Sequence, residues 1–416
     1  MKSEEFFKNL LTEQENYMSL GHGRHYLSIP GPSVMPDRVL QAMHQAAPNI
    51  YEGALYETVE GMLPDLRRVA RTQGEVAFYI CNGHGVWEAA LTNALSRGDR
   101  ILALNTGRFV ALWADMAEKL GVEVDLLDFG KASPVDLDQV EAKLKADSQH
   151  RYRAILVAQT DTASSVRNDI AALGVLIKST GHPALLMVDC MASLACDVFE
   201  MDAWGVDVMM AGSQKGLMTP PGLAFLYLNE RGMEARERAD LVTPYWDVRP
   251  RVKPDVFYEF FFGTAPTHHL FGLREALTML LEEEGLEQAW ARHAKLSQAV
   301  WAAFEAWGVG SSIQLNIKDR RYRSHSVTSV SMEAPYGSEL RKWTEHRAGV
   351  TLGLGIGMAE PDDPARHGYF RVAHMGHVNA HMTLGMLGVL DAGFKALKVT
   401  HGDGALEAAS RILSEA

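Results

Sequence analysis

One lysine, Lys215, lies in an unusual setting for a charged side chain. In the stretch MMAGSQKGLMTPPGLAFLYL it follows a run of small and apolar residues and precedes a Pro-Pro-Gly turn. A buried ammonium group is costly unless it is paired with an anion or takes part in chemistry. An exposed loop lysine is the ordinary alternative, so the interpretation of Lys215 depends on whether the rest of the chain supplies partners.

Two further features follow apolar segments that we predict to be strands. Asp189 ends the segment ALLMVD, where an aspartate either caps a helix or carries a buried charge. The segment EVAFYI is followed by CNGHGVWEAAL, in which Gly83 and Gly85 allow a tight turn into a helix that begins near Val86. The first N–H groups of that helix, with those of Gly83 and His84, form an anion site. The third glycine of the dinucleotide-binding fingerprint is absent, which disfavours a hydride-transfer enzyme.

An amine, a carboxylate and an anion site at neighbouring strand ends match the needs of one cofactor, pyridoxal 5′-phosphate. Its aldehyde requires an amine, its ring nitrogen requires an anion, and its phosphate requires N–H and O–H donors. Sequential strands in sheets of this kind usually lie side by side, so we expect Asp189 and Lys215 to share a pocket. A hydrophobic setting also lowers the pKa of the lysine towards a reactive free amine.

The elements that must position these residues alternate between strand and helix patterns in the middle of the chain. Apolar strands separated by amphipathic helices predict a parallel sheet with helices on both faces, and ligands bind such sheets at the carboxyl ends of the strands. After about Gly285, long amphipathic helices precede short strand-like pieces and a final helix pair. We therefore predict an N-terminal arm and interlobe segment (1–35), a large domain (36–285) and a smaller C-terminal α+β domain (286–416).

Several motifs resemble those of class V, fold-type I aminotransferases, particularly the alanine–glyoxylate and serine–glyoxylate (or serine–pyruvate) branch. The motifs are PGPSVMP, GHGVWEAALTNAL, NTGRF, VDCMAS, GSQKGLMTPPGLAF, FGLREAL and FRVAHMGH. Pyridoxamine–pyruvate aminotransferase is a related member of this family. The resemblance implies a large domain with a mostly parallel sheet of the seven-stranded type between helices.

The resemblance also assigns roles to individual residues. Lys215 is expected to form the Schiff base with the cofactor and to move the α-proton, and Asp189 to pair with the pyridine nitrogen. Arg371 is expected to hold the substrate α-carboxylate, and a planar guanidinium suits this task in both half-reactions. The remaining cofactor contacts are expected from the phosphate-binding Asn82, Gly83, His84 and Gln214, from the ring-stacking Phe109, from Thr162 near the phenolic oxygen, and from Thr264 of a neighbouring subunit.

Three positions depart from the family pattern. Asn82 replaces a serine that is usual in the phosphate loop, Phe261 replaces a common tyrosine, and Ser165 replaces a glycine for which the sequence offers no account. The first two substitutions reduce or rearrange the donors for the phosphate. Ser213 and Gln214 are retained, which favours a permanently held, phosphorylated cofactor over the use of unphosphorylated pyridoxal as a substrate.

Composition and charge exclude several other classes of protein. The chain of 416 residues has a formal net charge of −12, which argues against nucleic acid or an anionic membrane as a partner. Its three cysteines form no CxxC pair, which suits a reducing compartment, so the cytoplasm is the default location. No metal site is expected. Phe6, Phe7, Leu10, Leu11 and Met18 predict a short amphipathic N-terminal helix.

We therefore expect a PLP-dependent aminotransferase that moves an amino group from a small amino acid (of the alanine, serine or aspartate type) to a small 2-oxo acid such as glyoxylate or pyruvate. The expected role of Thr264 implies a homodimer or a dimer of dimers. The alternatives are a pyridoxamine–pyruvate-type transaminase, a PLP-dependent lyase on the same fold, or a non-catalytic cofactor-binding regulator. Arg249 is a candidate for a second substrate carboxylate, and Cys81 and Cys190 are interpreted as core residues.

Overall fold

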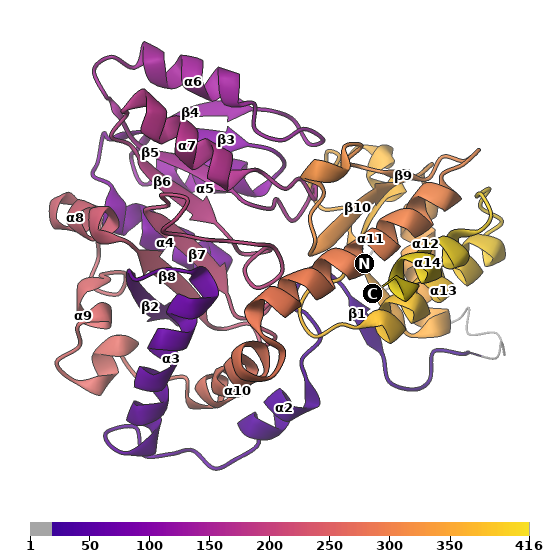
Figure 1. The fold of residues 1–416 in the computed structure, drawn as a ribbon, viewed down its shortest axis with the longest axis horizontal. Helices are drawn as coiled ribbons and strands as arrows, with labels where there is room; N and C mark the ends of the chain where they lie inside the picture. Colours follow the sequence, from indigo (N-terminus) through magenta and orange to yellow (C-terminus); the bar gives the residue numbers. More distant parts are fainter. Residues whose placement is uncertain (1–18, 416) are drawn as a thin grey trace, which may run out of the picture.

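The computed structural model describes residues 19–415, which form two lobes joined by the long helix α11, Leu286–Trp307 (Figure 1). The amphipathic helix predicted for the first residues lies outside the described part of the chain. The larger lobe is built on a seven-stranded sheet and the smaller one on a five-stranded sheet. This arrangement confirms the predicted α/β fold class.

The large sheet has the order β2-β8-β7-β6-β5-β3-β4, and only β8 runs antiparallel to its neighbours. Its central strands are apolar and buried on both faces, as expected for a parallel sheet that helices cover from two sides. The strands are β2 (Glu75–Tyr79), β3 (Arg100–Asn105), β4 (Glu123–Asp128), β5 (Tyr152–Ala158), β6 (Leu185–Asp189), β7 (Val208–Gly212) and β8 (Ala224–Leu228).

Two separate hydrophobic cores cover the two faces of this sheet. One core takes its helical residues mainly from α3, α6, α7 and α10, and the other from α4, α5 and α8. The helices and turns of this lobe are α2 (Asp37–Met43), α3 (Ala54–Ala70), α4 (Gly83–Ala94), α5 (Phe109–Lys119), α6 (Leu137–Ala146), α7 (Ile170–Thr180), α8 (Glu230–Arg238), α9 (Arg249–Val252), the 3₁₀ turn η1 (Phe257–Phe260), α10 (Thr267–Thr278) and the π-helical η2 (Met279–Glu284).

The small sheet has the order β1-β11-β12-β10-β9 and packs on the helices of the C-terminal region. Its first strand, β1, comes from the N-terminal part of the chain and pairs in parallel with β11, so the predicted arm and interlobe segment is partly built into this sheet. The elements are β1 (Tyr26–Ser28), β9 (Gln314–Leu315), η3 (Arg320–Tyr322), β10 (Val327–Ser331), α12 (Tyr336–Ala348), β11 (Val350–Leu354), η4 (Pro364–Gly368), β12 (Tyr369–Ala373), α13 (Ala380–Ala396) and α14 (Ala405–Ser414).

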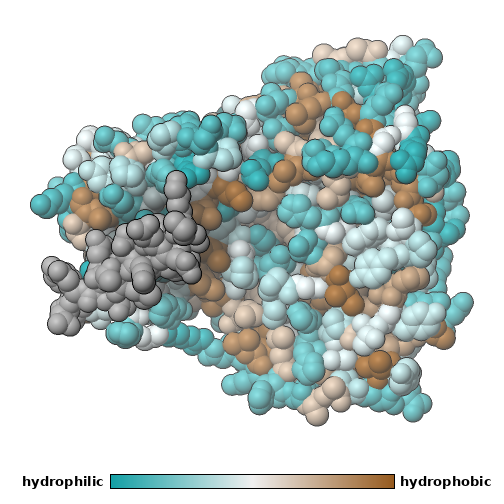
Figure 2. Space-filling model, turned by 180° about the vertical axis from the view of Figure 1, so that it is seen from behind, coloured by the Kyte–Doolittle hydropathy of each residue, from teal (hydrophilic) through white to brown (hydrophobic). Residues whose placement is uncertain are grey.

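On the face shown in Figure 2, hydrophilic residues predominate and hydrophobic residues form separate patches. Within residues 19–415 no helix has the length and apolar character that crossing a membrane requires.

Candidate active site

The predicted cofactor residues gather at the carboxyl ends of the central strands of the large sheet. Asp189 is the last residue of β6 and lies in register between Ala158 of β5 and Met210 of β7. Lys215 follows the end of β7 by three residues. Because β6 and β7 are adjacent and parallel, their ends open at the same edge, as the sequence predicts.

The carboxylate of Asp189 is buried and has two hydrogen-bond donors. The indole N–H of Trp87 donates to one oxygen at 3.1 Å, and the backbone N–H of Met191 donates to the other at 2.6 Å. Burial raises the pKa of Asp189 to about 6, and the two donors, together with the charge of Lys215, oppose that rise. A carboxylate in this state gains from a positively charged partner at neutral pH.

Lys215 is partly enclosed by the segment that crosses between the lobes. Its Nζ donates to the carbonyl oxygen of Pro30. The next residue, Gly31, has a φ of +94°, and a β-carbon at this position would lie 2.5 Å from Nζ, so only glycine fits. Burial lowers the pKa of Lys215 to about 8, and the charge of Arg371 adds to this effect. The lysine is therefore poised to act as a free amine near neutral pH.

The residues of the predicted anion site, Asn82, Gly83 and His84, lie at the start of α4. Asn82 is the N-cap of α4, and its side-chain oxygen accepts hydrogen bonds from the N–H groups of His84 (3.1 Å) and Gly85 (3.3 Å). Asn82 and His84 are exposed and Gly83 is partly so. The end of the helix is therefore open to solvent, and its cap carries no charge.

Phe109 and Thr162 are placed by a second buried carboxylate, that of Asp161. One oxygen of Asp161 accepts the N–H groups of Arg108 and Phe109, each at 2.8 Å, and the other accepts those of Ala163 and Ser164, each at 2.9 Å. Asp161 thus fixes both the start of α5 and the turn that contains Thr162. The ring of Phe109 lies edge-on to Trp87, with the ring centroids 6.2 Å apart.

Arg371, on β12, joins the two lobes at the site. Its Nε donates to the Leu354 carbonyl at 2.6 Å, and its Nη1 donates to the Thr162 carbonyl at 2.7 Å. No carboxylate of residues 19–415 forms an ion pair with it. Burial lowers the pKa of Arg371 to about 10, so it stays a cation at neutral pH. The remaining N–H groups are free for an acidic ligand.

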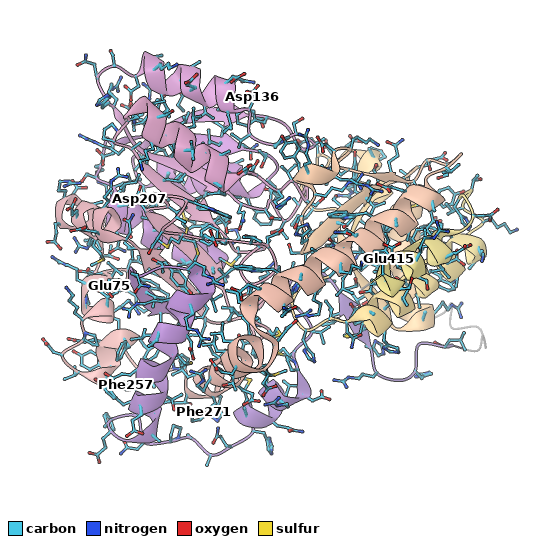
Figure 3. The ribbon with its side chains drawn as sticks, viewed as in Figure 1. Glu75, Asp136, Asp207, Phe257, Phe271 and Glu415 are labelled. Carbon is cyan, nitrogen blue, oxygen red and sulfur yellow. The ribbon has the colours of Figure 1, made fainter. Side chains whose placement is uncertain are left out.

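Gln214 and Thr264, the last two predicted site residues, differ in exposure. The side-chain oxygen of Gln214 is buried and has no hydrogen-bond partner in the described part of the chain. Thr264 is exposed, on the segment that follows η1. Phe257, at the start of η1, lies at the lower end of the large lobe in Figure 3, where its ring contacts Tyr56 of α3. Thr264 is thus presented on the surface and not inside the pocket of its own chain.

Four residues that shape the site are not among those predicted from the sequence. Trp87 and Asp161 hold the predicted residues in place, and Pro30 and Gly31 enclose the lysine. Their signals were present in the sequence, in GHGVWEAAL, TDTASS and IPGP, but no local pattern shows which partner a tryptophan or an aspartate will meet.

Ser165, unexplained from the sequence, has a structural role. It occupies the left-handed region with a φ of +63° and its hydroxyl accepts the N–H of Ser329 at 3.1 Å. Ser329 is paired with Arg371 in the small sheet. The serine thus ties the Asp161 turn to the strand pair that carries Arg371, a bond that a glycine would not make.

Three other candidates lie in ordinary structural settings. Arg249 is exposed and pairs with Asp247 (3.1 Å) and Glu237 (3.6 Å), so it is not free for a substrate carboxylate. Burial raises the pKa of both Cys81 and Cys190, which makes each thiol a poor nucleophile.

Comparisons with known proteins agree with this geometry. The model of the family described as aminotransferase class-V matches residues 25–361. A serine–glyoxylate aminotransferase of Methylorubrum extorquens is 34% identical over 93% of this chain and 96% of its own length. An L-aspartate–glyoxylate aminotransferase of Paracoccus denitrificans is 32% identical over 86% and 87%, respectively. The crystal structure of pyridoxamine–pyruvate aminotransferase from Mesorhizobium loti superposes with a TM-score of 0.84 at 22% identity, and covers 95% of this chain and 98% of that one.

Proposed function

The chain belongs to the class-V aminotransferases, and from that premise we propose that it holds pyridoxal 5′-phosphate between Asp189 and Lys215. The substrates proposed are a small amino acid as donor and a small 2-oxo acid, such as glyoxylate or pyruvate, as acceptor. The observation that carries the proposal is the pairing of a buried acid and an enclosed amine at adjacent strand ends, with opposite pKa shifts. The buried Asp189 carboxylate can pair with the protonated ring nitrogen of the cofactor, and the Lys215 amine can react with its aldehyde.

The residues present fit this cofactor in three respects. The Asp189 carboxylate is buried with only two donors, which leaves it room for a protonated ring nitrogen. The buried oxygen of Gln214 lacks a partner, which points to a missing polar group in this pocket. The exposed start of α4 offers N–H groups and a favourable helix dipole to a phosphate.

When bound, pyridoxal phosphate supplies an aldehyde that joins amines covalently and a ring that accepts electrons from the amino-acid Cα. The protein's residues orient the reactants around it. Arg371 is proposed to hold the substrate α-carboxylate with its free N–H groups, and Phe109 to cover one face of the ring. With the cofactor bound, Lys215 would take the proton from Cα of the amino acid and deliver it to C4′ of the cofactor, since its pKa of about 8 leaves a fraction of the side chain as free amine.

The phosphate is proposed to bind Gly83, His84 and Gln214. Asn82 must give up its own hydrogen bonds to His84 and Gly85, or turn its N–H₂ group towards the phosphate, when that ligand arrives.

A partner subunit is proposed to complete the phosphate site. Phe261 contributes no donor, because a phenyl ring has no N–H or O–H group, and its ring is buried against Phe78 and Phe257. Thr264, three residues later, is exposed and carries a hydroxyl. We propose that this hydroxyl reaches the phosphate held by the second subunit of a homodimer.

Glyoxylate as the acceptor is supported by the two relatives, which both use it according to their names but differ in the donor. The pyridoxamine–pyruvate alternative is less favoured because Ser213 and Gln214 are both retained before the lysine. We keep the cytoplasm as the proposed location, since Cys81, Cys190 and Cys196 are all free thiols.

The decisive experiment is a spectrophotometric screen of the purified enzyme with amino acids and 2-oxo acids. We expect small amino acids to shift the cofactor absorption to that of the amine form, and glyoxylate or pyruvate to reverse the shift. Lys215→Ala should bind the cofactor without the lysine-linked absorption and lose turnover, whereas Lys295→Ala, a lysine remote in sequence from the site, should retain both. Release of a product other than the 2-oxo acid of the donor would favour the lyase instead.

A further inference from the structure

Arg108 precedes the ring-stacking Phe109 at the start of α5, where its backbone is held firmly. Its backbone N–H donates a hydrogen bond to the Asp161 carboxylate at 2.8 Å, which fixes the position of the backbone from which the side chain extends. The stem of the side chain packs on Gly357 of the small lobe. A β-carbon at Gly357 would lie 2.5 Å from Cδ of Arg108, and Gly357 has a φ of +72°. The arginine therefore reaches from the large lobe to a turn of the small one.

The side chain of Arg108 is partly buried, and within residues 19–415 no hydrogen bond or ion pair to its guanidinium group is found. This differs from Arg249, whose charge is satisfied by two carboxylates. Removing a cation partly from water without a partner is costly, so a guanidinium in this state points to an anionic ligand.

The position of this charge is fixed from two sides. The charge of Arg108 adds to burial in lowering the pKa of His84, so it lies near the start of α4. On the other side, Gly357 lies three residues after Leu354, whose carbonyl accepts a hydrogen bond from Arg371. Arg108 and Arg371 thus approach the same turn from different lobes, one from α5 and one from β12.

We propose that Arg108 binds the side-chain carboxylate of the amino donor while Arg371 holds the α-carboxylate, which makes a dicarboxylic amino acid the preferred donor. This inference rests on the proposed function, and it names the substrate class of the same site. The side-chain carboxylate of the donor would be the anionic partner of Arg108. A guanidinium can bind a carboxylate through two parallel hydrogen bonds. An uncharged donor such as L-alanine would leave Arg108 without a partner.

The test compares L-aspartate with L-alanine in the wild-type holoenzyme and in Arg108→Gln, with glyoxylate as the acceptor. We expect kcat/KM for L-aspartate to fall about 10- to 100-fold, the loss that follows from one charge-assisted hydrogen-bonded pair, and that for L-alanine to change less than about 3-fold. Arg108→Lys should restore part of the activity with L-aspartate. Arg249→Gln removes a paired arginine from the predicted site mouth and should leave the donor ratio unchanged.

Because a phosphate offers similar chemistry to a carboxylate, the affinity for pyridoxal phosphate is measured in the same variants. An unchanged affinity in Arg108→Gln assigns the arginine to the substrate, and a weakened affinity together with equal losses for both donors assigns it to the cofactor and overturns the proposal. A wild-type enzyme that uses L-alanine well and L-aspartate poorly also overturns it, while the proposed transamination stands. An enzyme that uses neither donor, nor any other amino acid, overturns both.

Discussion

The first N–H groups of α4 and of α5 have acceptors of different charge, a neutral amide for α4 and a carboxylate for α5. Each helix follows a strand of the large sheet, and each presents N–H groups towards the site. The start of α5 is closed by the buried carboxylate of Asp161, which accepts two of its N–H groups. The start of α4 is capped by Asn82, which is neutral and exposed.

The difference favours the start of α4 over that of α5 as the proposed phosphate site. A carboxylate in the cap satisfies the helix dipole and repels a second anion, whereas an amide in the cap can be displaced. The acid at α5 instead aims Phe109 and Arg108 into the site. The charge of the side chain that accepts the first N–H groups therefore distinguishes the helix proposed to bind the phosphate from the helix that positions side chains.

The largest loss of cofactor affinity should follow from placing a carboxylate at the start of α4, as Asp161 does at the start of α5. Asn82→Asp places a negative charge within contact of the proposed phosphate, and a repulsion of a few kcal/mol should weaken binding of pyridoxal phosphate about 100-fold. Titration of the apo-protein measures this affinity. Unphosphorylated pyridoxal is the control ligand, and its affinity should not change. An equal loss for both ligands would mean that α4 does not hold the phosphate.

The reverse change, Asp161→Asn, should cost stability rather than phosphate affinity. The new amide can accept from only one pair of the four N–H groups, so two buried donors lose their acceptor at a cost of about 2 to 4 kcal/mol. Urea unfolding of the apo-protein measures the free energy of unfolding. Asp136→Asn is the matched control, because Asp136 caps α6 in the same way but at the exposed rim seen in Figure 3, and it should show a much smaller loss.

Asp189→Asn tests whether Asp189, unlike Asp161, is kept for the cofactor and not for the stability of the fold. Since burial raises the pKa of Asp189 from 3.8 to about 6, the folded protein binds its proton more tightly than the unfolded chain does. The ionised group is therefore destabilising above pH 6, and this penalty disappears as the pH falls towards 4. The asparagine amide can accept only one of the hydrogen bonds that Trp87 and Met191 donate to separate oxygens, a loss that does not depend on pH. We therefore expect the free energy of unfolding of the apo-variant, relative to that of the wild type, to be about 2 to 3 kcal/mol higher at pH 7.5 than near pH 4.

The control for this measurement is Asp247→Asn. Although burial opposes the effect, hydrogen bonds from Arg236 and Arg249 lower the pKa of Asp247 to about 2, so its ionised form stabilises the fold and its loss should destabilise the protein at neutral pH. The Asp189 variant should lose transaminase activity at every pH. A pH-independent difference from the wild type would contradict the buried, raised-pKa state of Asp189.

Ser165→Ala should have the mildest consequence, and it tests the link between the Asp161 turn and the small lobe. The variant loses one hydrogen bond to Ser329, so the free energy of unfolding should fall by about 1 kcal/mol. If this link also positions Arg371, KM for the donor should rise while kcat stays nearly constant. Ser165→Gly, which relieves the positive φ, should be less destabilising than Ser165→Ala.

Local sequence pattern is sufficient to predict the fold class and the strand ends at which the central residues lie. The alternation of apolar strands and amphipathic helices predicted the parallel sheet, because this pattern depends on which side chains are buried and hence on local periodicity. The order of motifs placed Asp189 and Lys215 at strand ends, where parallel topology brings them together.

The way in which these residues are held, and which charges remain free, followed from the packing of whole elements. Trp87 meets Asp189 across 102 positions of sequence, and Arg371 meets the carbonyl of Thr162 across 209. No local pattern encodes such contacts, because they join elements that are distant along the chain. The same is true of Arg249 and Arg108, which are both arginines near a predicted site. Only their three-dimensional neighbours show that Arg249 is paired and that Arg108 has no partner for its guanidinium among residues 19–415.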